Sequence, residues 1–226
     1  MYGVSIVFVI LIIYVYNIQY NKGEYEKIFL TELINNEYLK TGDIIIFKSY
    51  NNFNSVLMGN YYSHIGVVYI DPDDEKKIPL LFEANGVENM NLLNHHNKNG
   101  IFLSPVEERI QKYKGRAFVK RLNKKVDEQK IKEFKYFIDF CLKNMSYEYN
   151  IIKSAVYKYL SLERCGKKTN CGELVFLSIL KLGLISIEEY DKSCLHYLKW
   201  MSYVKELNYG YSYMDILEII DYPFNI

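Results

Sequence analysis

The feature that most constrains the fold is a change of pattern midway along the chain. The first half carries short apolar runs rich in Ile and Val, separated by turn-forming residues: Asp43–Lys48, His64–Ile70, Ile78–Ala84 and Arg116–Leu122. Runs of this length and composition predict β-strands. From Asp127 onward, apolar residues recur at helical spacing instead. Strands followed by helices favour an α+β domain, with a small, mostly antiparallel sheet flanked by helices.

Two helices in the second half have both an apolar face and recognisable ends. The segment Asp127–Lys143 places one stripe of apolar side chains along a single helix face. These side chains are Ile131, Phe134, Phe137, Ile138 and Cys141. The second helix follows Asn170, a residue type that caps helix N-termini, and ends before Gly183, a residue type common just past a helix C-terminus.

Three further helices are predicted from shorter patterns. Apolar residues at helical spacing indicate a helix over Glu24–Leu39. The segment Ser104–Glu107 has the pattern of a helix N-terminus. Ser104 is suited to cap the helix, proline to take the first helical position, and glutamate to accept the backbone N–H of the capping residue. The tail after Ser212 is interpreted as another helix.

Length and charge limit the classes of protein to which the chain can belong. At 226 residues the chain suits one well-packed domain rather than two. The formal net charge is +1, and no long Lys/Arg block occurs, so nothing indicates a nucleic-acid partner.

The cysteines and histidines of the chain predict neither disulfides nor a metal centre. Four cysteines without a CxxC pair do not suit a disulfide framework or the usual zinc site, and they favour a reducing compartment. Cys141 is expected to be a small buried hydrophobe, and Cys165 and Cys194 lie in no motif. His95 and His96 belong to an Asn-rich stretch with no acidic or thiol partner placed to complete a metal site. No metal or cofactor is therefore predicted.

Residues 1–21 contain no charged side chain and are mostly apolar. A helix of about 20 apolar residues is long enough to cross the hydrocarbon core of a bilayer. The basic start and small-residue cleavage site of a signal peptide are missing. The segment predicts a single-pass membrane anchor. A signal peptide and a buried element of a soluble domain are the alternatives.

Cys171 is the first candidate for chemistry. It follows the capping residue Asn170, and the partial positive charge of a helix N-terminus favours the thiolate, which is the nucleophilic form. The helix positions facing inward, of which Cys171 is the first, are otherwise apolar except for Ser178. The alternative is a small buried cysteine without a chemical role.

His64 and Glu83 each stand at one end of a predicted strand. A histidine there can accept a thiol proton near physiological pH. A carboxylate beside it can hold the imidazole in its working tautomer. Taken singly, a half-buried structural histidine and a carboxylate facing water explain the two residues as well.

The order of these motifs along the chain resembles a known family. The four pieces are Gly42-Asp43-Ile44-Ile45-Ile46-Phe47, Ser63-His64-Ile65-Gly66-Val67, Phe82-Glu83-Ala84 and Asn170-Cys171-Gly172-Glu173-Leu174-Val175. Together they resemble the circularly permuted papain-like superfamily of NlpC type, and within it the YiiX/YebB-like branch that includes a poxvirus relative. The resemblance runs from residue 41 to 183 and includes the segment 144–149. In ordinary papain-like enzymes cysteine precedes histidine, so the reverse order here agrees with permutation.

The resemblance implies a permuted papain-like fold and a role for each candidate. Cys171 would attack a carbonyl, His64 would be the base, and Glu83 would orient the imidazole. Two departures stand out: Gly172 replaces the usual Ser or Thr, and residues 1–40 and those beyond 183 match nothing in the family. The implied division is an anchor over 1–21, a connecting helix over 22–40 and the catalytic domain over 41–226.

The predicted function is a cysteine-dependent hydrolase or acyltransferase. It would act on an amide, ester or thioester bond through an acyl-enzyme on Cys171. An anchor at 1–21 makes a lipid substrate plausible beside a peptide, because the site would be held near the headgroups. The alternatives are a catalytically silent, membrane-anchored interaction module and a purely structural membrane protein.

Overall fold

The computed structural model describes residues 25–35, 38–49, 62–85, 100–147, 168–186 and 204–221. Its strands are β1 (Glu26–Phe29), β2 (Ile44–Ser49), β3 (His64–Tyr69), β4 (Leu80–Ala84), β5 (Ile101–Pro105), β6 (Gly115–Lys120), β7 (Ser146–Tyr147), β8 (Lys168–Thr169) and β9 (Leu217–Ile220). Its helices are α2 (Leu30–Asn35), α4 (Val106–Gln111), α5 (Glu128–Asn144) and α7 (Cys171–Lys181), with the 3-10 turn η1 (Asn208–Gly210). The α+β class predicted from the sequence is confirmed.

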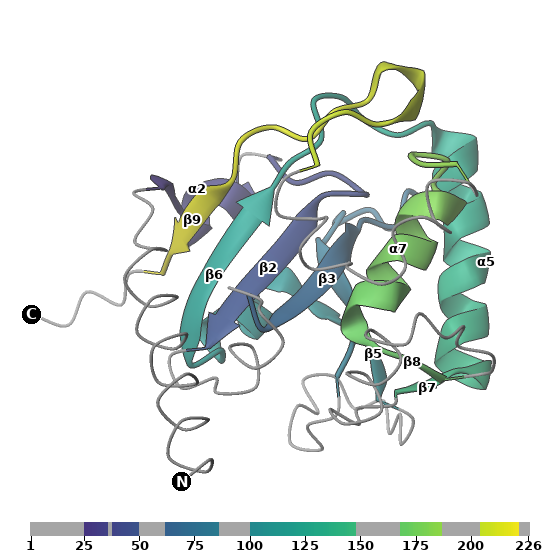
Figure 1. Cartoon of the computed structure of the whole chain (residues 1–226), viewed down its shortest axis with the longest axis horizontal. Coiled ribbons are helices and arrows are strands. Elements are labelled where there is room, and N and C mark those ends of the chain that lie inside the picture. The colour runs from purple at the N-terminus through teal and green to yellow at the C-terminus, as the bar shows by residue number, and fades with distance from the viewer. Residues whose placement is uncertain are drawn as a thin grey trace, which may run out of the picture.

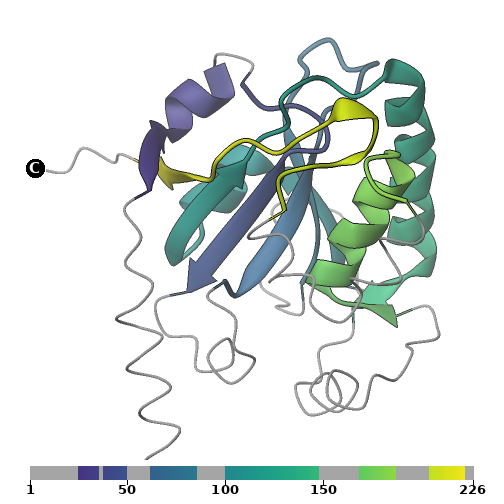
Figure 2. The same cartoon turned by 45° about the horizontal axis from the view of Figure 1, so that its top comes forward.

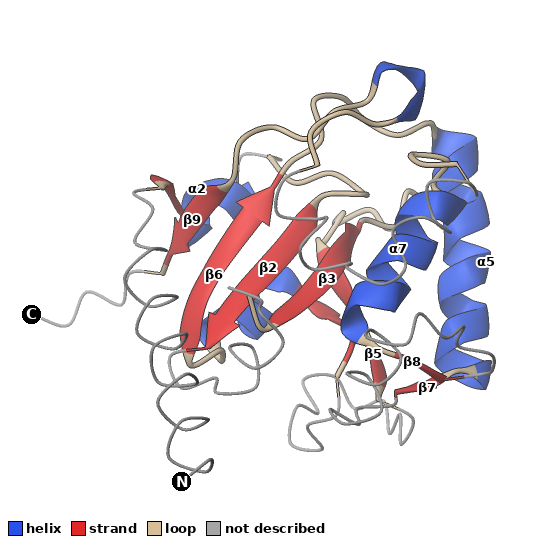
Figure 3. Ribbon diagram, in the orientation of Figure 1, coloured by secondary structure: helices blue, strands red, loops and turns tan. Residues whose placement is uncertain are grey.

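The strands form a mixed sheet in the order β1-β9-β6-β2-β3-β4-β5 (Figure 3). Neighbouring strands are antiparallel except for β1 and β9, which run parallel. The strands β2 and β3 lie at the centre, with four consecutive buried residues in β2 and five in β3. Such runs are expected of strands covered on both faces.

One sheet face packs against the two long helices. Figures 1 and 2 show α7 beside β3, with α5 outside it at the edge of the molecule. Alternate residues of the central strands point to this side, as the two-residue period of a strand requires. The core here includes Ile46, Ile65, Val67, Phe82, Phe134, Val175 and Ile179.

The opposite face packs against α2 and α4. Its core is formed by the strand residues of the other parity, together with Leu30 and Leu33 of α2 and Val106 and Ile110 of α4. The strand contribution comes from Ile45, Phe47, Val68, Leu81, Ala117 and Val119. The sheet is therefore buried on both faces, and the ends of its central strands are where polar side chains can reach a site.

The two long helices have the ends that the sequence predicts. The Asp127 carboxylate accepts the backbone N–H of Gln129 at 2.9 Å, which caps α5. At α7 the Asn170 side chain accepts the N–H of Glu173 at 3.0 Å. Gly183 ends α7 with a φ of 73°, and its N–H bonds to the Leu180 carbonyl, a geometry that glycine adopts without steric strain.

Three predicted helices differ from the structure. Residues 26–29 of the predicted helix 24–39, part of the connecting helix 22–40, form strand β1 because β9 pairs with them, and only Leu30–Asn35 is helical. The tail predicted as a helix after Ser212 contains β9 instead. The helix expected after Ser104 begins at Val106 with Pro105 at its N-cap and no side-chain cap, so capping by Ser104 is wrong.

Several predictions lie outside the described residues. They concern the apolar segment 1–21, the Asn-rich stretch with His95 and His96, the segment 148–149, and Cys165 and Cys194. In the ranges that the structure does describe, none of the helices combines the length and apolar character needed to cross a bilayer.

Candidate active site

His64 is the first residue of β3 and is fixed by its neighbours on both strands. In the β2–β3 register it lies opposite Phe47, and the two rings are 5.6 Å apart between centroids. The preceding residue, Ser63, ties the strand ends together. Its hydroxyl donates to the Phe47 carbonyl at 3.1 Å and accepts the Ser49 N–H at 3.0 Å. The backbone at His64 is therefore held firmly, and its side chain is 13% exposed.

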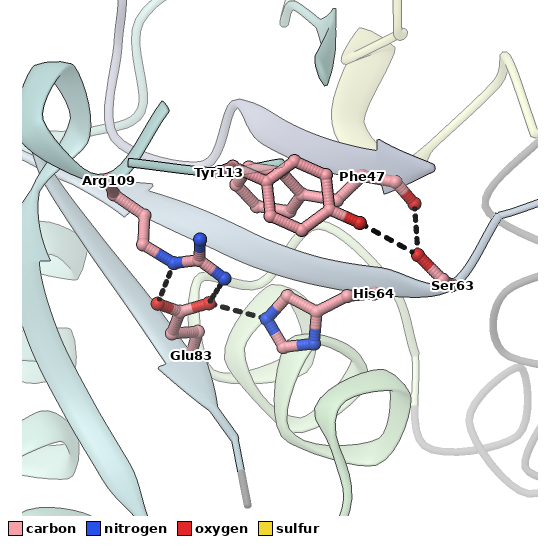
Figure 4. Close-up of polar contacts among 6 residues, drawn as sticks. All are labelled: Phe47, Ser63, His64, Glu83, Arg109 and Tyr113. Carbon is pink, nitrogen blue, oxygen red and sulfur yellow. Dashed lines mark hydrogen bonds and ion pairs between the residues drawn. The ribbon is translucent and has the colours of Figure 1, made fainter. Parts of the chain in front are cut away.

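Glu83 on β4 directs its carboxylate at the His64 ring. The Nε2 atom of His64 contacts Oε2 of Glu83 (Figure 4), and the carboxylate is 2% exposed. Gly66 makes this approach sterically feasible. A Cβ atom at that position would lie 2.8 Å from the Leu81 side chain and 3.2 Å from the Glu83 Cβ. The glycine of the Ser63–Val67 motif therefore leaves room for the side chains of β4.

Arg109, on α4, is the third member of this buried cluster. Its Nε donates to Glu83 Oε1 at 2.6 Å and its Nη2 to Oε2 at 3.2 Å, a two-pronged contact (Figure 4). The sequence analysis missed Arg109. A signal was nonetheless present, because Arg109 shares a face with Val106 and Ile110 at positions i, i+3 and i+4. A charged residue within an apolar stripe indicates a buried partner.

Aromatic rings enclose the arginine. The guanidinium carbon lies 4.6 Å from the Phe47 ring centroid and 5.4 Å from that of Tyr113. The Tyr113 hydroxyl is 3.1 Å from the Ser63 hydroxyl, which connects this layer back to the start of β3. Figure 4 shows the two rings above the cation, on the side away from Glu83. Cations are attracted to the faces of aromatic rings, more strongly where water is excluded.

Cys171 opens α7, the helix that packs against β3 and β4. Its side chain is half-buried, and a hydrogen bond with Cys171 is among the causes that raise the pKa of His64. The Asn170 cap takes the third N–H of the helix, that of Glu173. The sulfur lies in the first turn, where the helix dipole favours negative charge. Because Nε2 of His64 is engaged by Glu83, the ring nitrogen left for the sulfur is Nδ1.

The charges of the cluster shift the pKa values of His64 and Glu83 in opposite directions. Burial alone disfavours the charged imidazole, but the Glu83 charge and hydrogen bonds with Cys171 and Glu83 outweigh it and raise the pKa of His64 to about 9. Burial would raise the pKa of Glu83, yet His64 and Arg109 lower it. At neutral pH the pair is an imidazolium beside a carboxylate.

Cys141 provides a contrast within the same molecule. It lies on the inner face of α5 with no exposure, and burial raises the pKa of its thiol to about 12. A thiol in such surroundings is inert. The prediction that Cys141 is a small buried hydrophobe is confirmed.

Across the described segments, no group of three or more His, Cys, Asp or Glu side chains is arranged to hold a metal ion.

The structure brings the three predicted residues into one cluster. His64 and Glu83 are in direct contact, and Cys171 lies close enough to the same imidazole to raise its pKa. The expectation that Glu83 faces water, weighed as an alternative, is wrong, because the carboxylate is buried. Such an array can hold and move a proton between a sulfur and a ring nitrogen.

Comparison with known proteins adds little to this geometry. No protein-family model and no curated protein matches the chain. Among solved structures, it is similar to a protein described as metalloprotein YiiX from Escherichia coli O157:H7, with 18% identity and a TM-score of 0.42 over 63% of this chain and 66% of that one. The chain thus spans slightly less than two thirds of that protein's length. A TM-score of 0.42 does not establish a shared fold, so the proposals below rest on the chain's own residues.

Proposed function

We propose that this protein is a cysteine hydrolase or acyltransferase of the circularly permuted papain-like type, with Cys171 as nucleophile, His64 as proton carrier and Glu83 as the group that orients His64. One arrangement carries the proposal. A half-buried thiol at a helix start lies beside an imidazole that contacts a buried carboxylate. That arrangement is the one nucleophilic catalysis by cysteine requires.

The permuted fold is supported by chain order and packing. His64 comes from a strand early in the chain, and Cys171 opens a helix more than a hundred residues later, yet that helix packs on the same strand. Gly66 and Ser63, which flank His64 in its motif, each have a role in placing the imidazole or its carboxylate partner.

The reaction begins from an ion pair. With a pKa of about 9, His64 carries its proton at neutral pH, and a cation beside a cysteine sulfur stabilises the nucleophilic thiolate form. The sulfur attacks the carbonyl carbon of an amide, ester or thioester, forming a C–S bond while the carbonyl electrons move to oxygen. The Cys171 backbone N–H, in the first turn of α7, is suited to stabilise that oxyanion. His64 then gives its proton to the leaving group as the bond to it breaks.

The acyl-enzyme is resolved by a second proton transfer. Neutral His64 takes a proton from water, or from another acceptor, which attacks the thioester and releases Cys171. Throughout, Glu83 accepts from Nε2 and leaves Nδ1 free to face the sulfur. A carboxylate that fixes the imidazole in this way is the third member of a catalytic triad.

Residues 1–21 are proposed to anchor the protein in a membrane as a single span, with the catalytic domain in a reducing compartment. On that basis the acyl donor is a lipid or a lipid-modified molecule, with a peptide as the other class of substrate. The support is the uncharged, apolar composition of that segment.

Selective alkylation tests the proposal. Full-length protein is treated with limiting iodoacetamide at neutral pH, and the modification of each cysteine is followed by mass spectrometry. Cys171 should react far faster than the buried Cys141, and His64→Ala should strongly slow the reaction of Cys171. Acyl-lipid and dipeptide panels should then show turnover that is lost in Cys171→Ala. Equal and slow labelling of both cysteines, with no turnover, would favour a silent interaction module instead.

A further inference from the structure

The His64–Glu83 pair has a third charged partner that the proposed reaction leaves unused. Arg109 contacts both oxygens of the Glu83 carboxylate, and the two side chains are 1% and 2% exposed. A buried arginine is rare, because removing its charge from water is unfavourable unless a partner compensates. The position of this one, on the far side of the carboxylate from the imidazole, suggests a purpose beyond packing.

We propose that Arg109 is a positioning residue for the reaction, which holds Glu83 as a fixed, permanently ionised acceptor for His64 Nε2. The inference rests on the proposed function, since it assigns a task within the same site. Arg109 does not touch the sulfur or the acyl group. It acts through Glu83.

The geometry of the contact supports this role. Glu83 Oε1 accepts from Nε of Arg109, while Oε2 accepts from both Nη2 of Arg109 and Nε2 of His64. A guanidinium is planar, so a two-pronged contact sets the plane of the carboxylate as well as its position. The carboxylate cannot rotate without breaking a bond to Arg109. One of its oxygens is thereby kept directed at the imidazole.

The arginine is itself confined. Its guanidinium lies against the rings of Phe47 and Tyr113, and its neighbours on α4, Val106 and Ile110, are buried in the core beneath the sheet. Its remaining nitrogen, Nη1, is buried and finds no hydrogen-bond acceptor within the described residues. Its guanidinium forms an ion pair with the Glu83 carboxylate.

The charge order across the site explains why the arginine matters. From α7 to α4 the groups are the Cys171 sulfur, the imidazolium, the carboxylate and the guanidinium, so the carboxylate has a cation on each side. Among the described residues, Tyr113 is a further titratable side chain packed on the cluster, and burial raises its pKa, which keeps it neutral. Without Arg109 the buried carboxylate would have one cation instead of two. The proton on Nε2 would then pass to Oε2, leaving a neutral pair whose remaining imidazole proton lies on Nδ1.

That alternative proton arrangement disables the site. A neutral imidazole with its proton on Nδ1 presents a donor to the sulfur and has no lone pair there to accept the thiol proton. It also lacks the positive charge that stabilises a thiolate. Arg109 prevents this transfer by favouring the ionised carboxylate.

The test is the pH dependence of Cys171 alkylation by iodoacetamide in Arg109→Met and Arg109→Lys. Losing a hydrogen-bond partner that orients a metal-ligating histidine lowers metal affinity or activity roughly 10- to 100-fold. By analogy, the alkylation rate of Cys171 is expected to fall about tenfold in Arg109→Met. The acid limb of its rate–pH profile, where alkylation slows as the pH falls, should also move to higher pH, because removing a fixed positive charge favours protonation of its neighbours. Arg109→Lys keeps the charge but not the fork, so its acid limb should stay near that of the wild type while its rate falls. A loss of stability alone would not shift the acid limb of either variant, provided that circular dichroism shows the protein to be folded.

A double-mutant cycle separates action through Glu83 from action elsewhere. The variant Glu83→Gln with Arg109→Met keeps the buried cluster free of an uncompensated cation, so it is expected to fold even if a single variant does not. In the Glu83→Gln background, Arg109→Met should cause no further slowing. Equal slowing in both backgrounds would overturn the proposal, as would an Arg109→Met profile identical to that of the wild type. If the wild type itself shows no His64-dependent labelling of Cys171, the proposed function fails first, and the two failures are distinguishable.

Discussion

Two carboxyl groups lie buried at opposite ends of β3, and their pKa values move in opposite directions. Asp43, beside Val68, accepts the backbone N–H groups of Lys40 at 2.8 Å and Leu122 at 2.7 Å. Burial nevertheless raises the pKa of Asp43 to about 7. Glu83, near His64, has an equally dry environment, yet the charges of its two cationic neighbours lower its pKa.

The comparison shows what each kind of partner can do for a buried carboxylate. Backbone donors satisfy the oxygens of Asp43 but do not replace the solvation of a full charge, so the group is only partly ionised at neutral pH. Its task is to join residues 40–43 to the end of β6. Glu83 has two cations in contact and stays ionised. The charge of the neighbouring groups, rather than burial or the number of hydrogen bonds, therefore explains why the pKa of Glu83 falls while that of Asp43 rises.

The largest expected effect comes from exchanging each carboxyl for its amide. Glu83→Gln removes the group that fixes the His64 tautomer, and turnover on an acyl substrate should fall roughly 1,000- to 10,000-fold, the scale known for such a loss. Asp43→Asn should leave the turnover of folded protein unchanged. Steady-state kinetics on both variants gives the answer. Equal losses in the two variants would remove the distinction.

The second effect concerns stability and pH. Because the pKa of Asp43 rises from 3.8 unfolded to about 7 folded, folding favours its protonated form. Its contribution to the free energy of unfolding is complete at low pH and is lost as the pH rises toward 7, by about 4 kcal/mol in total. Urea unfolding of wild type and Asp43→Asn across this range should give a difference that falls with pH. A difference that is constant or increases would contradict the assignment.

The third effect tests the room around Glu83. Gly66→Ala places a Cβ against Leu81 and the Glu83 Cβ, at 2.8 and 3.2 Å, so β4 must move away from His64. We expect a destabilisation of roughly 1–3 kcal/mol and slower labelling of Cys171. Gly183→Ala is the matched control. Its Cβ would meet only the Lys130 Cε, at 4.0 Å, so the strain of a positive φ is the main cost, about 1–2 kcal/mol, and labelling should not change.

The smallest effect belongs to a third kind of buried polar group. The Ser104 hydroxyl is buried and has no hydrogen-bond partner within the described residues. Ser104→Ala removes an unsatisfied group, so stability should change little or improve slightly. A helix cap would cost about 1 kcal/mol on the same substitution. Thermal unfolding of the variant distinguishes the two, and a clear loss would show that Ser104 has a partner after all.

The sequence predicted what local pattern determines. The helices α5 and α7 were predictable because their caps and apolar faces lie within a few residues of one another. Strands β2, β3 and β4 were predictable from short Ile- and Val-rich runs between turns. Cys171, His64 and Glu83 stood out because each is a reactive or charged group at the end of such an element.

Long-range partners determined what was missed. Glu26–Phe29 has a pattern compatible with a helix, and it is a strand because β9, almost two hundred residues later, pairs with it. Arg109 carries no family motif, and its burial follows from the position of α4 over Glu83. The pKa of His64 could not be predicted from its sequence neighbours. The carboxylate and the thiol raise it, and neither is a sequence neighbour.

The central claim is that folding places Cys171 and Glu83 on either side of one imidazole. Nitrogen-15 NMR of histidine-labelled protein tests it directly, with the signal of His64 among the four histidines assigned by its loss in His64→Ala. In the wild type the ring should remain an imidazolium until a pKa of about 9, and Cys171→Ala should lower that pKa. Titration at the ordinary histidine value, indifferent to Cys171→Ala, would contradict the account.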